Sequence, residues 1–193
     1  MNLFEIILHE YPLASCGSFA GHRLASSIRK EFPKEIHGLI DHDERYLVRG
    51  SAGRSAWAHC PWLAVMDRRV TESPRRGFYP VYLFKKDLSG FYLSLNLAVA
   101  NIMARYRKKS RSVLKSQANI FRDAIGEIPP EFPLTSIELL GETDTAKNYE
   151  AGTVIAKYYG AGDVPDMQIM QEDLLLILEI YDYLITNENQ VVE

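Results

Sequence analysis

Hydrophobic residues in the first forty positions recur at helical spacing, which predicts two amphipathic helices. The apolar face of the first helix consists of Leu3, Phe4, Ile7 and Leu8. A second amphipathic stretch runs over residues 20–32, and Pro33 is expected to end it. We interpret both helices as packing elements.

Between residues 45 and 96 the spacing of hydrophobic residues changes to the two-residue period of β-strands. Trp62, Ala64 and Met66 fall on one face of their segment, and Tyr79, Val81 and Leu83 share a face of the next. This region predicts a mostly antiparallel sheet. Its expected strands are 45–49, 61–66, 77–84 and 91–96, with a glycine-bearing loop at 50–54 and a tight turn at 87–90.

The second half of the chain returns mainly to helical spacing. We predict a long helix over 98–124, whose many basic residues are interpreted as solvent-facing rather than as DNA contacts. No repeat or linker divides the chain, so the prediction is one α+β domain over 1–193: a mostly antiparallel, curved sheet flanked by helices. The remaining elements are a proline-rich connector (128–133), a short strand (136–140), a segment undecided between helix and irregular structure (147–159), and a helix (166–185).

Charge is segregated along the chain despite a net charge of only -3. The segment 44–122 contains 16 of the 22 lysines and arginines and only 4 of the 25 acidic residues. The rest of the chain is therefore strongly acidic. This asymmetry favours a basic working surface carried by the middle of the chain, although chance and solvated helix faces remain the alternative.

Several classes of protein are disfavoured by what the sequence lacks. No apolar run is long enough to span a bilayer, and the first residues do not resemble a signal peptide. The two cysteines, Cys16 and Cys60, form neither a disulfide framework nor a metal knuckle. Phosphate-loop, dinucleotide and nucleophile-elbow motifs are missing. We expect a reduced cytoplasmic protein without a cofactor or a metal, and a binding domain rather than an enzyme.

The densest group of acidic residues and histidines lies at 37–44. It could hold a divalent metal for phosphodiester chemistry, but a polar loop between a helix and the first strand explains it more simply. His59, in an apolar neighbourhood, is interpreted as structural. No nucleophile, base and orienting group assemble from the sequence.

Three segments of the basic, strand-rich middle and of the later chain carry a resemblance. They are Gly53-Arg-Ser-Ala-Trp-Ala-His-Cys-Pro-Trp62, Gly77-Phe-Tyr-Pro-Val-Tyr-Leu-Phe84 and Asn148-Tyr-Glu-Ala-Gly152. Together, in this order and followed by a helix that bears a tyrosine, they resemble the N-terminal DNA-binding domain of McrB-type, methylcytosine-dependent restriction proteins. The resemblance covers most of the chain.

The resemblance implies that a modified cytosine is flipped out of the duplex into a pocket formed here by Trp62, Leu83 and Tyr149. Two rings can sandwich an extruded base, at roughly 1–3 kcal/mol per stacked base, which offsets an extrusion cost of a few kcal/mol. Leu83 would meet the C5 substituent. Burial of one methyl group contributes only about 0.8 kcal/mol, so discrimination through Leu83 alone is expected to be modest.

The resemblance also implies a surface that contacts the DNA around the pocket. Arg54, Ser55 and Trp57 are the expected contacts at the gap left by the flipped base; Arg54 stands where the family has a tyrosine wedge, a departure that bears on the flipping mechanism. An arginine can stack on bases and bind phosphate. The expected phosphate contacts are Arg68, Arg69, Arg75 and Arg76.

The predicted function is therefore recognition of duplex DNA carrying 5-methyl-, 5-hydroxymethyl- or N4-methylcytosine, beside a nuclease or NTPase effector in another domain or subunit. Two alternatives stay open. One is a metal-dependent nuclease built on residues 37–44, and the other is a protein-interaction module whose acidic C-terminal helix binds a partner without any affinity for DNA.

Overall fold

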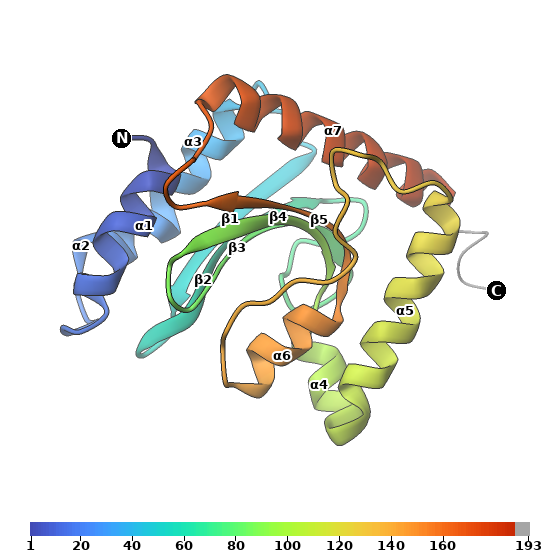
Figure 1. The fold of residues 1–193 in the computed structure, drawn as a ribbon, viewed down its shortest axis with the longest axis horizontal. Coiled ribbons are helices and arrows are strands. Elements are labelled where there is room, and N and C mark those ends of the chain that lie inside the picture. The colour runs from blue at the N-terminus through green and yellow to red at the C-terminus, as the bar shows by residue number, and fades with distance from the viewer. Residues whose placement is uncertain (188–193) are drawn as a thin grey trace.

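The computed structural model describes residues 1–187, which form a five-stranded antiparallel sheet with helices on both faces (Figure 1). The strands follow one another in the sheet in chain order, β1-β2-β3-β4-β5. The predicted α+β class is confirmed. The strands are β1 (Tyr46–Gly53), β2 (Trp57–Asp67), β3 (Phe78–Phe84), β4 (Gly90–Leu97) and β5 (Thr153–Gly160). The helices are α1 (Leu3–Ala14), α2 (Arg23–Lys30), α3 (Phe32–Gly38), α4 (Ala100–Tyr106), the 3-10 turn η1 (Arg107–Lys109), α5 (Ser110–Ile125), α6 (Asp144–Ala151) and α7 (Met167–Thr186).

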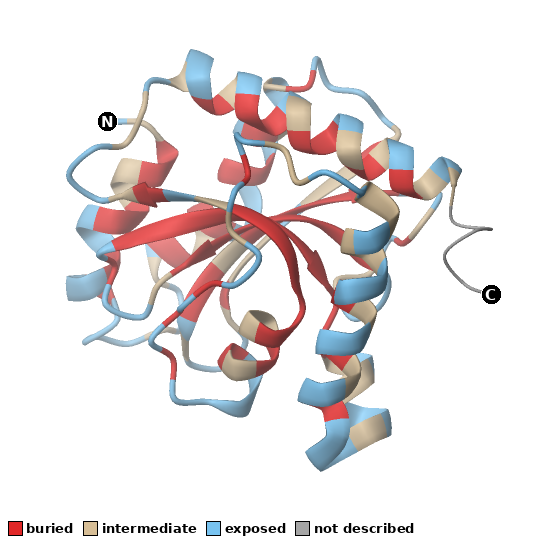
Figure 2. Cartoon of the chain, turned by 45° about the vertical axis from the view of Figure 1, so that its right-hand side comes forward, coloured by how far each residue is buried: buried red, intermediate tan, exposed pale blue. Residues whose placement is uncertain are grey.

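One face of the sheet, the α1 face, packs on α1 and α7. The Phe4 ring lies 5.0 Å from the Phe91 ring and is nearly parallel to it, and the Phe78 ring meets Tyr181 of α7 edge-on. Strands β3 and β4 are buried along their whole length, as the red ribbons in Figure 2 show. The apolar core therefore extends over both faces of the central strands.

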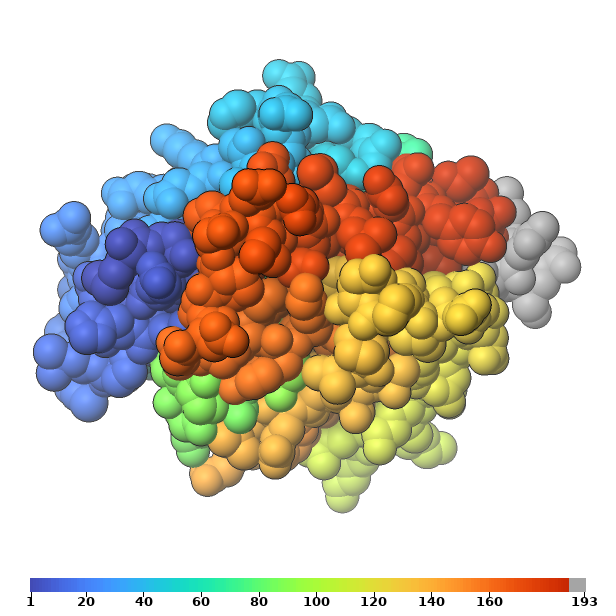
Figure 3. Space-filling model, turned by 45° about the horizontal axis from the view of Figure 1, so that its top comes forward, coloured from blue at the N-terminus to red at the C-terminus, as the bar shows by residue number. Residues whose placement is uncertain are grey.

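The opposite face of the sheet, the α6 face, is covered by α6 and by the connector that leads to it. Asn96 of β4 donates through Nδ2 to the carbonyl of Tyr149 on α6, at 3.1 Å. The first part of the connector runs over the surface, and residues 120–135, drawn in yellow, lie beside the red α7 in Figure 3. Helices α1 and α7 thus cover one face of the curved sheet, and α6 with its connector covers the other.

A buried ion pair joins β5 to α7 on the α1 face. Lys157 Nζ donates to both carboxylate oxygens of Asp173 at 2.7 Å, and the Tyr159 hydroxyl donates to Oδ2 at 2.7 Å. Burial, followed by the hydrogen bond to this carboxylate, raises the pKa of Tyr159 and keeps it a donor. The carboxylate is 6% exposed, so its partners replace nearly all of its hydration.

The close approach of α2 to β1 requires a glycine at position 50. A Cβ atom at Gly50 would lie 1.8 Å from the carbonyl oxygen of Ile28 on α2 and 2.7 Å from the side chain of Leu63. Only a residue without a side chain therefore lets the helix backbone rest on this strand.

Two predicted helices differ from those observed. Pro33 does not close the second helix but lies in the first turn of α3, where its missing N–H costs nothing. The single helix predicted over 98–124 is broken into α4, η1 and α5 at Arg107, whose φ of 48° lies in the left-handed region. The apolar stripe fails there, because Lys109 and Ser110 occupy the positions where the next apolar residues would fall.

The predicted strand at 136–140 is wrong, although its alternation is real. Ile137 and Leu139 are buried, but Leu139 N donates to Glu150 Oε1 and Leu139 O accepts from Lys86 N, so no strand ladder forms. The undecided segment 147–159 contains the end of α6 followed by β5. β1 extends through the predicted loop as far as Gly53.

Candidate functional site

Trp62 and Leu83 lie directly opposite each other on β2 and β3, on the α6 face of the sheet. Side chains of opposed residues on antiparallel strands start only about 5 Å apart, so these two are neighbours. Trp62 is partly exposed and Leu83 is fully buried. The expected pairing of an aromatic ring with an aliphatic wall is present at this point of the sheet.

Tyr149 reaches the same face from α6. The helix begins at Thr143, whose hydroxyl accepts from Ala146 N, and its C-terminal turn is held by the Asn96 hydrogen bond. Burial, with a smaller contribution from the neighbouring Cys60 thiol, raises the pKa of Tyr149 to about 12. Tyr149 and the two strand residues therefore lie on the same face of the sheet. We refer to Trp62, Leu83 and Tyr149 as the Trp62 cluster.

The two rings of this cluster pack against the apolar core but not on another ring. Within residues 1–187, neither Trp62 nor Tyr149 stacks on another aromatic ring, and the indole N–H of Trp62 donates no hydrogen bond. A row of short side chains crosses the sheet beside them: Ala64, Val81, Ser94 and Ala156. All four are buried, so the face of the sheet beside the cluster is closely packed.

Trp57, by contrast, is a packing residue of the β1–β2 hairpin. Its ring makes edge contacts with Tyr11, Phe19 and His22, and its Nε1 donates to the carbonyl of Gly17 at 3.1 Å. The indole thus ties the hairpin to the end of α1.

Arg54 and Ser55 are exposed at the tip of that hairpin, just after β1 ends. Arg29 of α2 donates to the carbonyl of Gly53 at 2.7 Å, which secures the base of the tip. Arg54 forms no ion pair within the described part of the chain. The structure therefore presents a cationic tip on a hairpin anchored by Trp57.

The four arginines expected to bind phosphate divide into two pairs. Arg68 forms an ion pair with Glu72, and Arg69 forms one with the buried Asp67 and another with Asp182 of α7. Arg75 and Arg76 are exposed and, among residues 1–187, have no acidic partner. Arg69 consequently has a structural role, whereas Arg75 and Arg76 keep their charge available.

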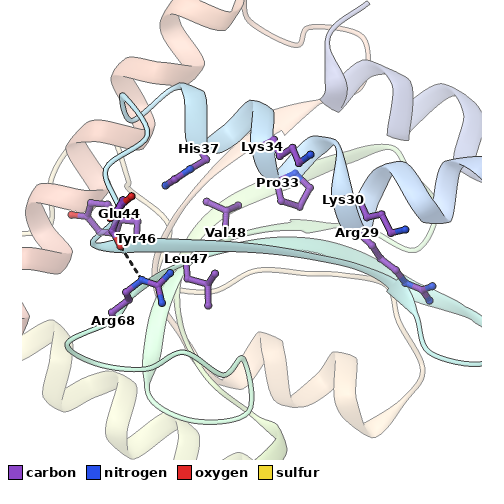
Figure 4. Close-up of a pocket in the computed structure, with 10 residues that line it drawn as sticks. All are labelled: Arg29, Lys30, Pro33, Lys34, His37, Glu44, Tyr46, Leu47, Val48 and Arg68. Atoms are coloured by element: carbon purple, nitrogen blue, oxygen red, sulfur yellow. Dashed lines mark hydrogen bonds between the residues drawn. The ribbon is translucent and has the colours of Figure 1, made fainter.

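A cationic groove along β1, which we call the β1 groove, brings Arg68 together with cations of α2 and α3 that the sequence did not single out (Figure 4). Its volume is about 690 Å³, and it lies between the α2–α3 pair and the outer edge of the sheet. Arg68 borders it and donates through Nε to the carbonyl of Glu44 at 2.8 Å. The other polar lining residues are Arg29, Lys30, Lys34, His37 and Glu44.

Lys30 and Lys34 have no ion-pair partner in the described residues, so most of the groove's positive charge is uncompensated. Arg49, exposed on β1 and opposite Ala64, adds a cation on the α6 face beside the Trp62 cluster. In the sequence, only the helical spacing of Arg29, Lys30 and Lys34 indicated that these cations share a surface. Their convergence depends on a helix break before Pro33 that the pattern did not reveal.

Cys60 provides a chemical test of this packing. Its Sγ donates to the Leu139 carbonyl, and burial raises the pKa of the thiol to about 11, so below that pH it stays a protonated, poor nucleophile. Near neutral pH we expect iodoacetamide to alkylate the exposed Cys16 and to leave Cys60 unmodified until the protein unfolds. Peptide mass mapping measures the alkylation of each cysteine. Rapid labelling of Cys60 in the folded protein would contradict its observed burial on β2.

Residues 37–44 form a polar turn rather than an assembled centre. His37 Nε2 lies 3.0 Å from the carbonyl of Asp43, and its ring meets that of His42 edge-on. In residues 1–187, no three side chains of His, Cys, Asp or Glu converge closely enough to hold one metal ion. Over the same residues, no helix has the length and apolarity to cross a bilayer.

Comparison with known families identifies one match. Residues 6–186 match a family model described as MrcB-like, N-terminal domain. The matched stretch begins within α1 and ends with the last residue of α7, so it contains the Trp62 cluster and the β1 groove. No curated protein matches the chain.

Proposed function

Because the chain belongs to the MrcB-like N-terminal domain family, we propose that it is the DNA-recognition module of a modification-dependent restriction system. In this proposal a modified cytosine leaves the duplex and enters the Trp62 cluster. The observation that supports it is that two rings without aromatic stacking partners and one leucine lie on a single face of the sheet. The family resemblance expected from the sequence is confirmed; the ligand is the proposal.

The energetics of the cluster suit an extruded base. Stacking on Trp62 and Tyr149 would replace the stacking lost on extrusion, at roughly 1–3 kcal/mol per base. The Trp62 indole N–H is available to donate a hydrogen bond to the base. Leu83, opposite Trp62 on the sheet, would form the wall that the C5 substituent of the base abuts.

The surroundings would hold the duplex through its backbone. Arg54 and Ser55 at the hairpin tip are placed to enter the gap left by the base, while Trp57 anchors the tip rather than contacting DNA. Arg75 and Arg76 are free to bind phosphates. Arg68 would contribute through the β1 groove, whereas Arg69, held by Asp67 and Asp182, would orient the loop that carries the others.

The proposed module binds DNA and does not cut it. A nuclease or an NTPase in another domain or subunit would act on the DNA after recognition, in the cytoplasm. The sequence contains no phosphate loop, which is consistent with an energy-consuming step located elsewhere.

The test compares the affinity of the protein for short duplexes that carry cytosine, 5-methylcytosine, 5-hydroxymethylcytosine or N4-methylcytosine at one position. We expect a preference for a modified base, and we expect Trp62→Ala and Tyr149→Ala each to remove it, with a loss of about 1–3 kcal/mol. Weak binding that depends on salt should remain, since the cations are untouched. Tyr183→Ala, at an exposed tyrosine of α7 outside the cluster, is the control for loss of a ring, and a thermal melt checks the folding of every variant. If both cluster variants keep the preference, the base does not bind there.

The β1 groove makes a separate prediction about salt dependence. Each phosphate neutralised by the protein contributes roughly -0.9 to the slope of log K against log salt concentration. Replacement of Lys30 and Lys34 together by glutamine should therefore flatten the slope by about 2 and weaken binding to modified and unmodified duplexes equally. The control is Lys109→Gln with Lys115→Gln, which removes the same charge from η1 and α5, outside the groove. An unchanged slope in the groove variant would place the DNA backbone elsewhere.

A further inference from the structure

A second cationic cavity lies at the break between α4 and α5, apart from both the Trp62 cluster and the β1 groove. It has a volume of about 460 Å³ and is closed on one side by α6. The break turns the chain so that consecutive residues of η1 and the first turn of α5 face the same space. We call it the α5 cavity; its lining residues are Met103, Arg107, Lys108, Ser110, Arg111, Asp144 and Asn148.

The α5 cavity carries an excess of positive charge. Of its three cations, Arg111 forms an ion pair with Asp144 at 2.5 Å, whereas Arg107 and Lys108 have no acidic partner among residues 1–187. The 16-residue helix α5 begins at this point with no side-chain cap and no acidic residue in its first turn. The partial positive charge of its N-terminus therefore adds to that of the side chains, as in sites that bind phosphate.

Asn148 supplies an unsatisfied acceptor in the wall of the same cavity. The residue is 2% exposed, and its Nδ2 donates to the carbonyl of Asp144 at 2.6 Å. This hydrogen bond fixes which amide atom is the nitrogen, so the other atom is an acceptor. In the described chain no donor reaches Oδ1. A buried acceptor without a donor is destabilising, and a bound N–H or O–H group would satisfy it.

We propose that the α5 cavity binds a nucleotide: its phosphate contacts Arg107, Lys108 and the start of α5, and a hydroxyl or N–H group of its sugar or base donates to Asn148. Inorganic phosphate satisfies the cations alone. A nucleotide can bind the cations through its phosphate and also donate a hydrogen bond to Asn148. The source is either a free nucleotide or a nucleotide of a DNA strand, and the proposal does not depend on recognition of a modified base by the Trp62 cluster.

The test uses ribose 5-phosphate and inorganic phosphate as probes, in calorimetric titrations of the full chain. Ribose 5-phosphate has no base, so it cannot stack in the Trp62 cluster. The principal variant is Arg107→Gly with Lys108→Gln; a glycine relieves the positive φ of 48° at position 107, so the fold is retained. The control, Arg105→Gln with Lys115→Gln, removes the same charge from neighbouring residues that do not line the cavity.

We expect the wild-type protein to bind ribose 5-phosphate more tightly than inorganic phosphate, and the principal variant to bind both roughly tenfold more weakly. Asn148→Ala should remove the preference for the sugar phosphate while phosphate binding persists. Equal affinities of the wild-type protein and the principal variant would overturn the proposal, as would a preference that survives Asn148→Ala. If ribose 5-phosphate displaces an unmodified duplex from the protein, the nucleotide that the cavity binds belongs to a DNA strand. If the two bind at the same time, the cavity binds a free nucleotide.

Discussion

Replacement of Lys157 by methionine is expected to lower the free energy of unfolding by about 3 kcal/mol, because it leaves the Asp173 carboxylate buried without a counter-ion. Methionine keeps most of the aliphatic stem of lysine, so the loss of stability measures the effect of removing the charge. The hydroxyl of Tyr159 would remain the only side-chain donor to this carboxylate in the described chain. Since α7 is joined to β5 through this pair, a thermal melt should show a midpoint lower by about 10 °C.

Lys86→Met is the matched control for this variant. The ion pair of Lys86 with Glu142 is long, at 3.4 Å, and 85% of the Glu142 side chain is exposed. Exposed pairs contribute only about 0–1 kcal/mol, so the control should unfold close to the wild-type temperature. Equal effects of the two substitutions would mean that the Lys157 pair contributes no more than a surface contact.

Replacement of Gly50 by alanine is expected to destabilise the fold by about 3 kcal/mol or more, because the new methyl group meets backbone rather than a movable side chain. The carbonyl of Ile28 can move away only if α2 shifts from β1. That shift would also displace Arg29 and Lys30, two of the cations of the β1 groove. Urea unfolding should show the loss of stability, and duplex affinity at low salt should fall with it.

Gly162→Ala serves as the reference for the same chemical change. A Cβ atom at Gly162 meets nothing within 4 Å, and its backbone is outside the left-handed region. The expected change in stability is within about 0.5 kcal/mol. If Gly50→Ala were equally mild, α2 would have to move freely on the sheet, contrary to the close packing observed.

The strand-rich centre of the fold was predictable because turn residues bound short segments rich in aliphatic and aromatic residues. The turn at 87–90 and the strands around it were found in this way. β5 was missed because the segment 147–159 joins the end of α6 directly to the strand, so no single period covers it. The break at Arg107 was missed because no glycine or proline marks it.

The candidate site was predictable only in part, since it joins segments that are distant along the chain. The resemblance selected Trp62, Leu83 and Tyr149, and the structure brings them to one face. Sequence alone did not separate the two tryptophans, because their roles depend on whether other rings pack around them. The ion pairs of Arg69 involve Asp182, more than a hundred residues away, so its structural role was equally hidden.

The β5 edge of the sheet is partly occupied by the chain itself. At β5, Leu134 and Ala156 exchange two backbone hydrogen bonds, at 3.1 Å and 2.7 Å, while α2 and α3 lie against β1. A strand from another copy would have to displace Leu134 before it could continue the ladder. The β5 edge is therefore protected at this point from pairing with a strand of another copy.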